Sequence, residues 1–392
     1  FHYYLCRQLK GGGMEIIMKV VIAIDSLKGS LSSIEAGMAA KEGILKAKPD
    51  AEIIVKPLAD GGEGTVDALV EGMGGERIDV TVTGPMGEPV CCYYGFLKDQ
   101  NTAIIEMASA AGITLVPDTE KNPLLATTYG VGEMIKDAME RGCRDFIIGI
   151  GGSATNDGGI GMLKALGYEF YDTDGADTGE GGQALAKVVS INVQNRHPLL
   201  SECKFRIACD VNNPLCGENG ATYIYGPQKG VADGLKEDLD AGMANFAKIT
   251  SDTLGRDCST VPGAGAAGGL GFAFLSYIGG ELIPGIDLIL SAVNLENELK
   301  EADVAVTGEG RLDHQTAMGK APVGVARLAK KYGIKTIAFA GAVTEGAATC
   351  NDAGIDAFFS IVRGAATLED SMEKSNARKN MSYTAEQVFR LL

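Results

Sequence analysis

The sequence predicts an α/β protein: a flavodoxin-like, doubly wound parallel sheet with a second, mixed α/β domain inserted into it. Three observations support this fold class. Apolar, β-branched runs such as Lys19–Ile24 are typical of strands that are buried on both faces of a parallel sheet. Helical patterns alternate with such runs near both ends of the chain. The middle of the chain instead carries strand patterns separated by short turns, which favours antiparallel pairing.

The two ends of the chain supply the first sheet. Ser32 and Glu35 form a capping-box pattern that begins the helix after the first strand, and Pro322 begins the helix after the third strand. Five strands with interleaved helices complete a small doubly wound sheet. The expected strands are residues 19–24, 52–55, 303–306, 335–340 and 357–362.

The expected domain boundaries follow from this division. Residues 18–75 and 299–392 form the flavodoxin-like domain, and residues 76–298 form the insert. Residues 146–150 are a strand followed by a loop and a helix, so they fit either sheet. An insert placed here leaves from the amino ends of the first sheet's strands, whereas ligands bind at the carboxyl ends. Either the insert folds back over the sheet, or the boundary lies elsewhere.

The composition is that of a globular protein, with 45% hydrophobic and 22% charged residues among 392. The formal net charge of −16 argues against a nucleic-acid or membrane-surface binder, because anionic phosphates would be repelled. The nine cysteines are odd in number and none form C-x-x-C, which indicates reduced thiols in a cytoplasmic protein, without zinc or disulfides. No apolar run approaches the roughly 20 residues needed to span a bilayer.

Residues 1–17 are interpreted as an N-terminal extension, and Met18 is the expected natural start. The extension has too few apolar residues for a signal peptide, and no function is assigned to it.

Polar loops follow the expected strands, at the edge where open α/β sheets bind ligands. Glycine loops at helix starts offer backbone N–H groups to phosphates. Aspartates in these loops can hold Mg²⁺ or accept a hydroxyl proton, and Lys28, Arg311 and Lys320 can neutralise developing negative charge. Together they favour phosphoryl transfer. The loops are residues 25–30, 60–64, 151–159, 210–214 and 307–313.

Each of these features also has a structural interpretation. Asp25 and Asp60 could cap helices. Residues 151–159 could be a turn, and residues 210–214 could be a loop with Asx turns. Lys28 could be a solvated surface lysine. Arg311 could pair with Asp313 for structural reasons alone.

Two stretches resemble nucleotide-binding motifs without the context or the residues that such motifs require. Residues 263–268 match G-x-G-x-x-G but follow no clear strand, so helix packing or approach to a phosphate is favoured over a dinucleotide site. Gly319 and Lys320 do not complete a P-loop, because His314 stands at the first glycine position and Ala321 follows the lysine. An ATP site would therefore not be of P-loop type. A carboxylate base is favoured over His314.

Six segments occur in the order of a known family. The chain resembles the bacterial glycerate kinase family, the two-domain type without a P-loop, from about Met18 to the C-terminus. The segments are IDSLKGSLSS, PLADGGEGT, GIGGSATNDGG, CDVNNPLCG followed by GPQKG, GAGAAGGLG and TGEGRLDHQTAMGKAPVGVA.

The resemblance implies a flavodoxin-like domain with an insert similar to a restriction-endonuclease fold. It implies transfer of the γ-phosphoryl group of ATP to D-glycerate, with ATP and Mg²⁺ as cofactors. Members that act in sugar-acid or glyoxylate breakdown make 2-phosphoglycerate, so a glycerate 2-kinase is expected. Which hydroxyl reacts and the oligomeric state stay open at this point.

Residue roles are assigned as hypotheses. A guanidinium matches a carboxylate in two-point fashion, so Arg311 is expected to bind the glycerate carboxylate. Asp313 or Asp210 is the expected base or Mg²⁺ ligand. The expected catalytic residues are Asp313, Asp210 and Lys28. Further substrate-binding residues are Ser26, Asp60, Glu309 and Thr316. The expected nucleotide or phosphate contacts are Gly151, Gly152, Ser153, Asn156 and Lys320.

Two other function classes are alternatives to a kinase. One is a non-catalytic sensor of sugar acids or phosphorylated metabolites, which release of ADP in the presence of glycerate and Mg-ATP would exclude. The other is an oxidoreductase that uses the glycine-rich residues 263–268, which absence of NAD(P)H binding would exclude.

Overall fold

The first sheet has five parallel strands in the order β13-β12-β11-β1-β2. The computed structural model describes residues 17–392, so the expected extension lies outside the described residues apart from Ile17. Numbered along the chain, the order is 2-1-3-4-5, which is the flavodoxin order. The predicted fold class is confirmed. The strands are β1 (Lys19–Ile24), β2 (Glu52–Pro57), β11 (Val304–Leu312), β12 (Lys335–Val343) and β13 (Ala357–Ser360).

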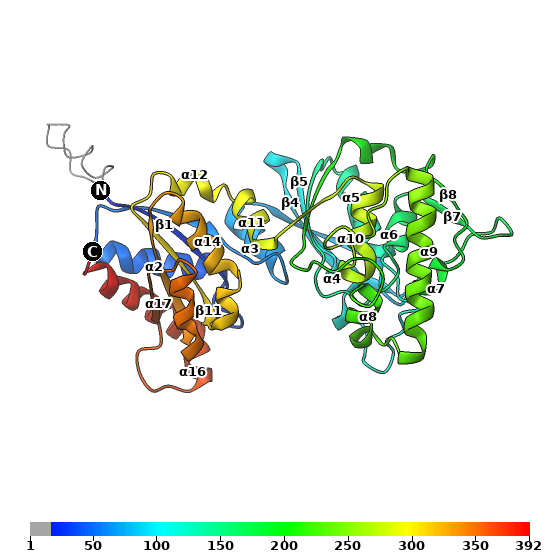
Figure 1. Ribbon diagram of the computed structural model, residues 1–392. Helices are drawn as coiled ribbons and strands as arrows, with labels where there is room; N and C mark the ends of the chain where they lie inside the picture. The colour runs from blue at the N-terminus through cyan, green and yellow to red at the C-terminus, as the bar shows by residue number, and fades with distance from the viewer. Residues whose placement is uncertain (1–16) are drawn as a thin grey trace.

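Helices cover both faces of this sheet (Figure 1). On one face, Val20 and Ile22 of β1 pack in a common core with residues of α2 (Ser33–Ala47) and α17 (Lys374–Phe389). On the other face, Val21 and Ala23 pack with residues of the helices α3, α11, α12 and α14. None of the helices within residues 17–392 is long and apolar enough to cross a membrane. The second set of helices is α3 (Thr65–Met73), α11 (Gly285–Ala292), α12 (Leu295–Leu299) and α14 (Ala321–Lys330).

The second sheet has six strands in the order β10-β9-β6-β5-β4-β3. As predicted, β3, β4 and β5 pair antiparallel. The strand that fitted either sheet is β6, and it lies between β5 and β9 in this second sheet, parallel to both. The strands are β3 (Glu76–Thr83), β4 (Pro89–Leu97), β5 (Thr102–Glu106), β6 (Asp145–Gly149), β9 (Lys204–Ala208) and β10 (Glu281–Ile283).

Further helices and a small hairpin of β7 (Glu169–Tyr171) and β8 (Ser190–Asn192) complete the middle of the chain. The hairpin, β10 and several short helices had no prediction. The longest helix among the described residues is α9, with 19 residues. The helices here are α4 (Ala108–Ala111), α5 (Tyr129–Glu140), α6 (Ile160–Ala165), α7 (Gly182–Leu185), α8 (Ala221–Tyr225), α9 (Lys236–Leu254) and α10 (Ala266–Tyr277).

The third strand of the first sheet is longer than predicted, which corrects one expectation. Residues 307–312 were expected to form a loop, but they continue β11 to Leu312 and pair in register with β12. Gly308 permits this close pairing, because a side chain there would meet the Phe339 carbonyl oxygen at 2.0 Å. The glycines and charges in this stretch are typical of a loop, and the ladder with β12 overrides that local preference.

The second sheet lies beside the first, with α3 and α11 between the two sheets (Figure 1). One core cluster joins Val66 of α3 and Ile289 of α11 to Ile104 and Ile147 of the second sheet and Ala23 of the first. The two sheets are therefore packed together through these helices. The boundaries at residues 75/76 and 298/299, and the choice between the two geometric alternatives, stay predictions.

The carboxyl ends of β2, β6 and β9 meet at one loop. A side chain at Gly149, the last residue of β6, would meet the Gly61 carbonyl oxygen at 2.6 Å. A side chain at Gly61 would lie 2.9 Å from the Ala208 methyl carbon at the end of β9. Gly61 also has a φ of +87°, which favours glycine. Loops from both sheets are thereby brought to one place.

Candidate active site

A cavity of about 430 Å³ lies at this meeting point of the two sheets. Its volume is within the range of small-molecule sites. Three loops that follow strands line it: residues 60–62 after β2, 150–153 after β6 and 209–211 after β9. Tyr225, Gln228, Lys229, Ala266 and Ala267 are among the residues that complete the lining.

Of the predicted phosphate-binding residues, Gly151, Gly152 and Ser153 line the cavity. Gly152 has a φ of +74°, and its carbonyl oxygen accepts a hydrogen bond from the Ile113 N–H at 2.8 Å. Within residues 17–392, the structure contains no hydrogen bond donated by the backbone N–H groups of these three residues. This backbone therefore offers unused donors at the cavity wall.

The rest of the same glycine-rich loop turns into the protein. Asn156 is fully buried, lies outside the cavity lining, and its Nδ2 donates to Thr222 Oγ1 at 3.0 Å. Asp157 is also fully buried, and burial raises the pKa of its carboxyl group. Its Oδ2 accepts from both the backbone N–H and the hydroxyl of Thr128 at 2.8 Å. The side chains of this half of the loop bond to groups within the protein, and the predicted contact of Asn156 with a phosphate stays a prediction.

Asp60 and Asp210 both line the cavity, each with one carboxylate oxygen held by backbone. Asp60 Oδ1 accepts from the Gly62 N–H at 2.9 Å, and Asp210 Oδ1 accepts from the Gly285 N–H at 2.8 Å. Gly285 begins α11, and a side chain there would meet the Asp60 carbonyl oxygen at 2.2 Å. Partial burial raises the pKa of Asp210, and the charge of Asp60 raises it further.

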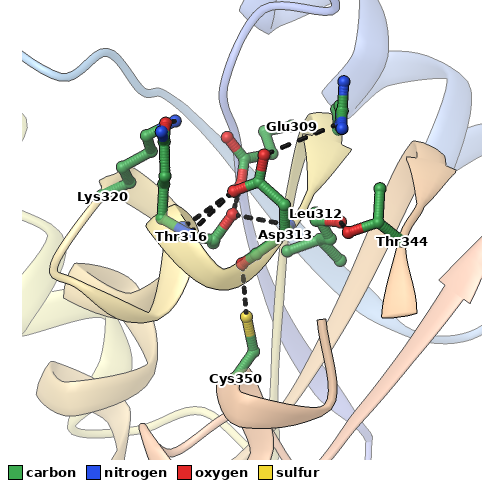
Figure 2. Close-up of polar contacts among 9 residues, drawn as sticks. Glu309, Leu312, Asp313, Thr316, Lys320, Thr344 and Cys350 are labelled. Atoms are coloured by element: carbon green, nitrogen blue, oxygen red, sulfur yellow. Dashed lines mark hydrogen bonds and ion pairs between the residues drawn. The ribbon is translucent and has the colours of Figure 1, made fainter. Parts of the chain in front are cut away.

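Four other predicted residues gather at the carboxyl edge of the first sheet, around α13 (His314–Ala317), as Figure 2 shows: Glu309, Asp313, Thr316 and Lys320. Glu309 Oε1 accepts from Thr316 Oγ1 at 2.5 Å. Asp313 caps α13, because its Oδ1 accepts from the Gln315 N–H at 2.9 Å and the Thr316 N–H at 3.3 Å. Arg311 Nε lies 3.7 Å from Asp313 Oδ2, so the structural pairing of these two residues is present.

The cations at this edge are open to solvent. The Arg311 side chain is 67% exposed, and Lys28 and Lys320 are exposed as well. Exposed ion pairs stabilise a fold by only about 0–1 kcal/mol, so the Arg311 pair contributes little to folding. All three cations remain accessible to an anionic ligand. None of them lines the cavity described above.

Asp25 and Asp60 lie between the residues of the cavity and those around α13, because Asp60 lines the cavity and the charges of Asp60 and Glu309 both act on Asp25. Neither aspartate caps a helix. Ser32 caps α2, and α3 begins after Gly64 without a side-chain cap. The pKa of Asp25 is raised to about 7, mainly by burial and also by the charges of Asp60 and Glu309, against the opposing effects of the Ser26 hydrogen bond and Lys28. Ser26 donates its backbone N–H to Asp25 Oδ1 at 2.7 Å. Sequence reasoning placed Asp25 in a candidate loop but gave it no role, because burial is not visible in sequence.

The stretch at residues 263–268 is used for packing, which is one of the two roles that the sequence interpretation favoured over a dinucleotide site. A side chain at Gly265 would meet the Pro214 carbonyl oxygen at 2.2 Å, and one at Gly268 would meet the Thr155 carbonyl oxygen at 2.1 Å. The glycines let the start of α10 approach the loop after β6. Ala267 in this stretch has a φ of +53° and lines the cavity.

Comparison with known proteins identifies the family. A sequence model described as the glycerate kinase family matches residues 20–392. The chain belongs to the glycerate kinase family. It is 46% identical over 371 residues to a glycerate kinase of Bacillus subtilis, covering 95% of this chain and 97% of the relative. It is 45% identical over 354 residues to the glycerate 2-kinase of Escherichia coli, covering 90% of this chain and 93% of the relative.

The solved structures agree with this family assignment. A crystal structure assigned to glycerate kinase 2 of Salmonella typhimurium LT2 superposes with a TM-score of 0.88 and 43% sequence identity. The match covers 96% of this chain and 98% of that chain. The predicted family is confirmed, and the protein is a kinase of the transferase class.

The burial of Asp25 predicts that Asp25→Asn stabilises the protein more at high pH than at low pH. The ordinary pKa of 3.8 rises to about 7 on folding, so the folded state disfavours the ionised carboxylate. This cost is absent below the unfolded pKa, grows as the pH rises, and is complete above the folded pKa. At about 1.36 kcal/mol per pKa unit, the variant gains up to about 4 kcal/mol at pH ~8.

Urea denaturation at about pH 5 and about pH 8 measures this difference in the free energy of unfolding. Asp50→Asn is the matched control, because Asp50 is exposed and the substitution removes the same charge. An equal effect of Asp25→Asn at both pH values would contradict the prediction.

Proposed function

We propose that this protein is an ATP-dependent glycerate 2-kinase that transfers the γ-phosphoryl group of ATP to D-glycerate. Membership of the glycerate kinase family supports the substrate class. The observation that carries the proposal is the cavity at the junction of the two sheets. It combines unused backbone N–H donors of residues 151–153, the cation Lys229 and the carboxylate Asp210 in one enclosure. The name of the Escherichia coli relative favours the 2-position.

ATP is proposed to bind in the cavity with its phosphates at residues 151–153. Backbone N–H groups of a glycine loop bind phosphate oxygens without the need for a net positive surface. This suits a chain with a net charge of −16. The site needs no P-loop, in agreement with the sequence at Gly319 and Lys320.

Glycerate is proposed to bind at the carboxyl edge of the first sheet, beside Asp60. Arg311 and Lys28 are the accessible cations there for its carboxylate. Glu309 and Thr316 bond to each other, so we assign them to holding α13 against β11 rather than to direct substrate contact. The predicted roles of Ser26 and Lys320 stay predictions.

Asp25 is proposed as the general base. Its pKa of about 7 lies near the working pH, where a base combines sufficient ionisation with sufficient proton affinity. In the reaction the glycerate hydroxyl oxygen forms a bond to the γ-phosphorus, and the bond from this phosphorus to the β–γ bridging oxygen breaks. The hydroxyl proton passes to Asp25, and ADP leaves.

The residues at the cavity fit Mg²⁺. This ion usually binds through one or two carboxylates, water and substrate phosphates. Asp210 provides a solvent-accessible carboxylate with only Oδ1 held by backbone, and it lies on the cavity that is proposed to hold the phosphates. Asp313 lies outside the cavity lining and caps α13, so Asp210 is the better ligand of the two predicted. When bound, Mg²⁺ neutralises charge on the phosphate oxygens.

Within residues 17–392 no cluster of three or more His, Cys, Asp or Glu side chains forms a metal site. A site completed by substrate phosphates does not require one. The expectation of a cytoplasmic protein also stays a prediction.

Phosphorus NMR of the product tests the proposed reaction. Incubation with D-glycerate and Mg-ATP is expected to give ADP and a phosphomonoester whose phosphorus couples to one proton, as in 2-phosphoglycerate. Coupling to two protons would identify 3-phosphoglycerate and overturn the proposed position. No ADP and no phosphomonoester would overturn the kinase proposal and favour a non-catalytic sensor of sugar acids.

Activity measurements on two variants identify the base. Asp25→Asn is expected to lower kcat by about 10²–10⁴-fold, the range for loss of a general base. It is also expected to remove the rise of kcat/KM through about pH 7 that the wild type shows, because Asp25 must be ionised to accept the proton. Asp60, Glu309 and Lys28 are the charged groups acting on Asp25, and all remain in the variant. Asp313→Asn is expected to keep this pH profile. The opposite result would make Asp313 the base.

The Mg²⁺ dependence of the rate tests Asp210. Asp210→Asn is expected to raise the Mg²⁺ concentration for half-maximal activity by about 10–100-fold, the cost typical of disturbed metal ligation. Asp240→Asn is the matched control, because Asp240 also accepts from a backbone N–H, that of Gly217 at 3.0 Å, and lies outside the cavity lining. An unchanged Mg²⁺ dependence in Asp210→Asn would exclude it as a ligand.

A further inference from the structure

Lys229 is a buried lysine at the wall of the cavity. It is 2% exposed, whereas its neighbours Gln228 and Gly230 are exposed. It ends the short 3-10 helix Pro227–Lys229, and the chain turns away at Gly230, which has a φ of +94°. Lysine is almost never fully buried unless it is paired. Among residues 17–392, no carboxylate forms an ion pair with Lys229.

The ammonium group has more donors than the protein uses. Nζ donates to Ser153 Oγ at 2.6 Å and to the Thr155 carbonyl oxygen at 2.7 Å. A lysine ammonium has three N–H donors, so one is left for another acceptor. Ser153 belongs to the same loop as Gly151 and Gly152, whose backbone N–H groups are also unused. These donors surround one part of the cavity wall.

Carboxylates lie near Lys229, but among the described residues none forms an ion pair with its ammonium group. Asp157 is the carboxylate whose charge acts on it, but Asp157 is held by Thr128 and by backbone N–H groups. Asp60 and Asp210 line the same cavity. Burial lowers the pKa of Lys229 to about 7, and Asp157 offsets only part of this effect.

A purely structural role would need only a neutral donor to fasten the loop after β6. A buried amine at a ligand cavity, with a spare donor next to free backbone N–H groups, has a use only when an anion enters. We propose that Lys229 is the phosphate-binding cation of this cavity and donates its third N–H to the terminal phosphoryl group of ATP. This inference rests on the proposed function, because it assumes that ATP occupies the cavity.

A change of protonation accompanies this contact. Above about pH 7 the empty site favours a neutral Lys229, which avoids an unpaired buried charge. A bound phosphate stabilises the charged form and raises the pKa of the lysine. Binding of ATP above this pH therefore takes up a proton. If a carboxylate released a proton when ATP bound, the measured proton change would have the opposite sign.

Isothermal titration calorimetry with ATP tests the proposal at about pH 8, in EDTA and in two buffers of different ionisation enthalpy. At this pH the terminal phosphate, with a pKa of about 6, is already ionised and takes up no proton itself. The wild type is expected to take up close to one proton on binding ATP. Lys229→Met is expected to take up none and to bind ATP about 10–100-fold more weakly, the loss typical of a hydrogen bond to a charged group.

Two further variants keep the test decisive. Lys164→Met is the matched control, because Lys164 also makes two hydrogen bonds, to Asp177 and Gly179 at 2.6 Å, outside the cavity lining. It is expected to behave as the wild type. Ser153→Ala removes one partner of Lys229 but leaves the amine, and it is expected to retain the proton uptake even if Lys229→Met fails to fold.

The outcomes separate the two proposals. ATP binding by the wild type without proton uptake, together with unchanged ATP affinity in Lys229→Met, would overturn the role of Lys229 and leave the kinase proposal standing. Loss of proton uptake in Ser153→Ala as complete as in Lys229→Met would show that Lys229 only fastens the loop. A wild type that does not bind ATP at all would overturn the proposed function itself, and the inference with it.

Discussion

The close contact of Gly61 with Gly149 and Ala208 is the constraint on which the site depends. At this point the backbone of a loop from the first sheet lies directly against the ends of two strands of the second. Cβ atoms at Gly61 or Gly149 would force the sheets apart, and interiors are too closely packed to absorb such a shift cheaply. Asp60, the residues after β6 and Asp210 reach one cavity because nothing bulkier than hydrogen separates them here.

The site also holds more buried charge than a fold alone would favour. Burial favours the neutral form of both Asp25 and Lys229. It raises the pKa of Asp25 from 3.8 to about 7 and lowers the pKa of Lys229 from 10.5 to about 7. Each costs stability at neutral pH, and neither is compensated by a contacting ion pair among the described residues. Groups with such shifts concentrate where chemistry is done. In this protein Asp25 lies on the side where glycerate is proposed to bind, and Lys229 lies on the side where the ATP phosphates are proposed to bind.

The sequence predicted the parts that local pattern determines. Apolar, β-branched runs located the strands of the first sheet, and the short turns located the antiparallel part of the second. It could not predict that residues 307–312 extend β11, because only the pairing with β12 makes that stretch a strand. Nor could it show that Asn156 faces inward while Ser153 lines the cavity, or that Lys229 is buried between two exposed neighbours. Burial is set by partners that are distant in the chain.

The position of α3 and α11 between the two sheets has a consequence for how the chain can be divided. Each of these helices contributes apolar side chains to a core that both sheets share. Removing residues 76–298, or isolating them, would expose one side of that core to water. The cost in folding free energy is about 25 cal/mol for each Å² of apolar surface exposed. The strand order therefore separates two sheets, but their shared core makes neither sheet complete without the other. The two sheets therefore share one apolar core, and each depends on the other to keep that core out of water.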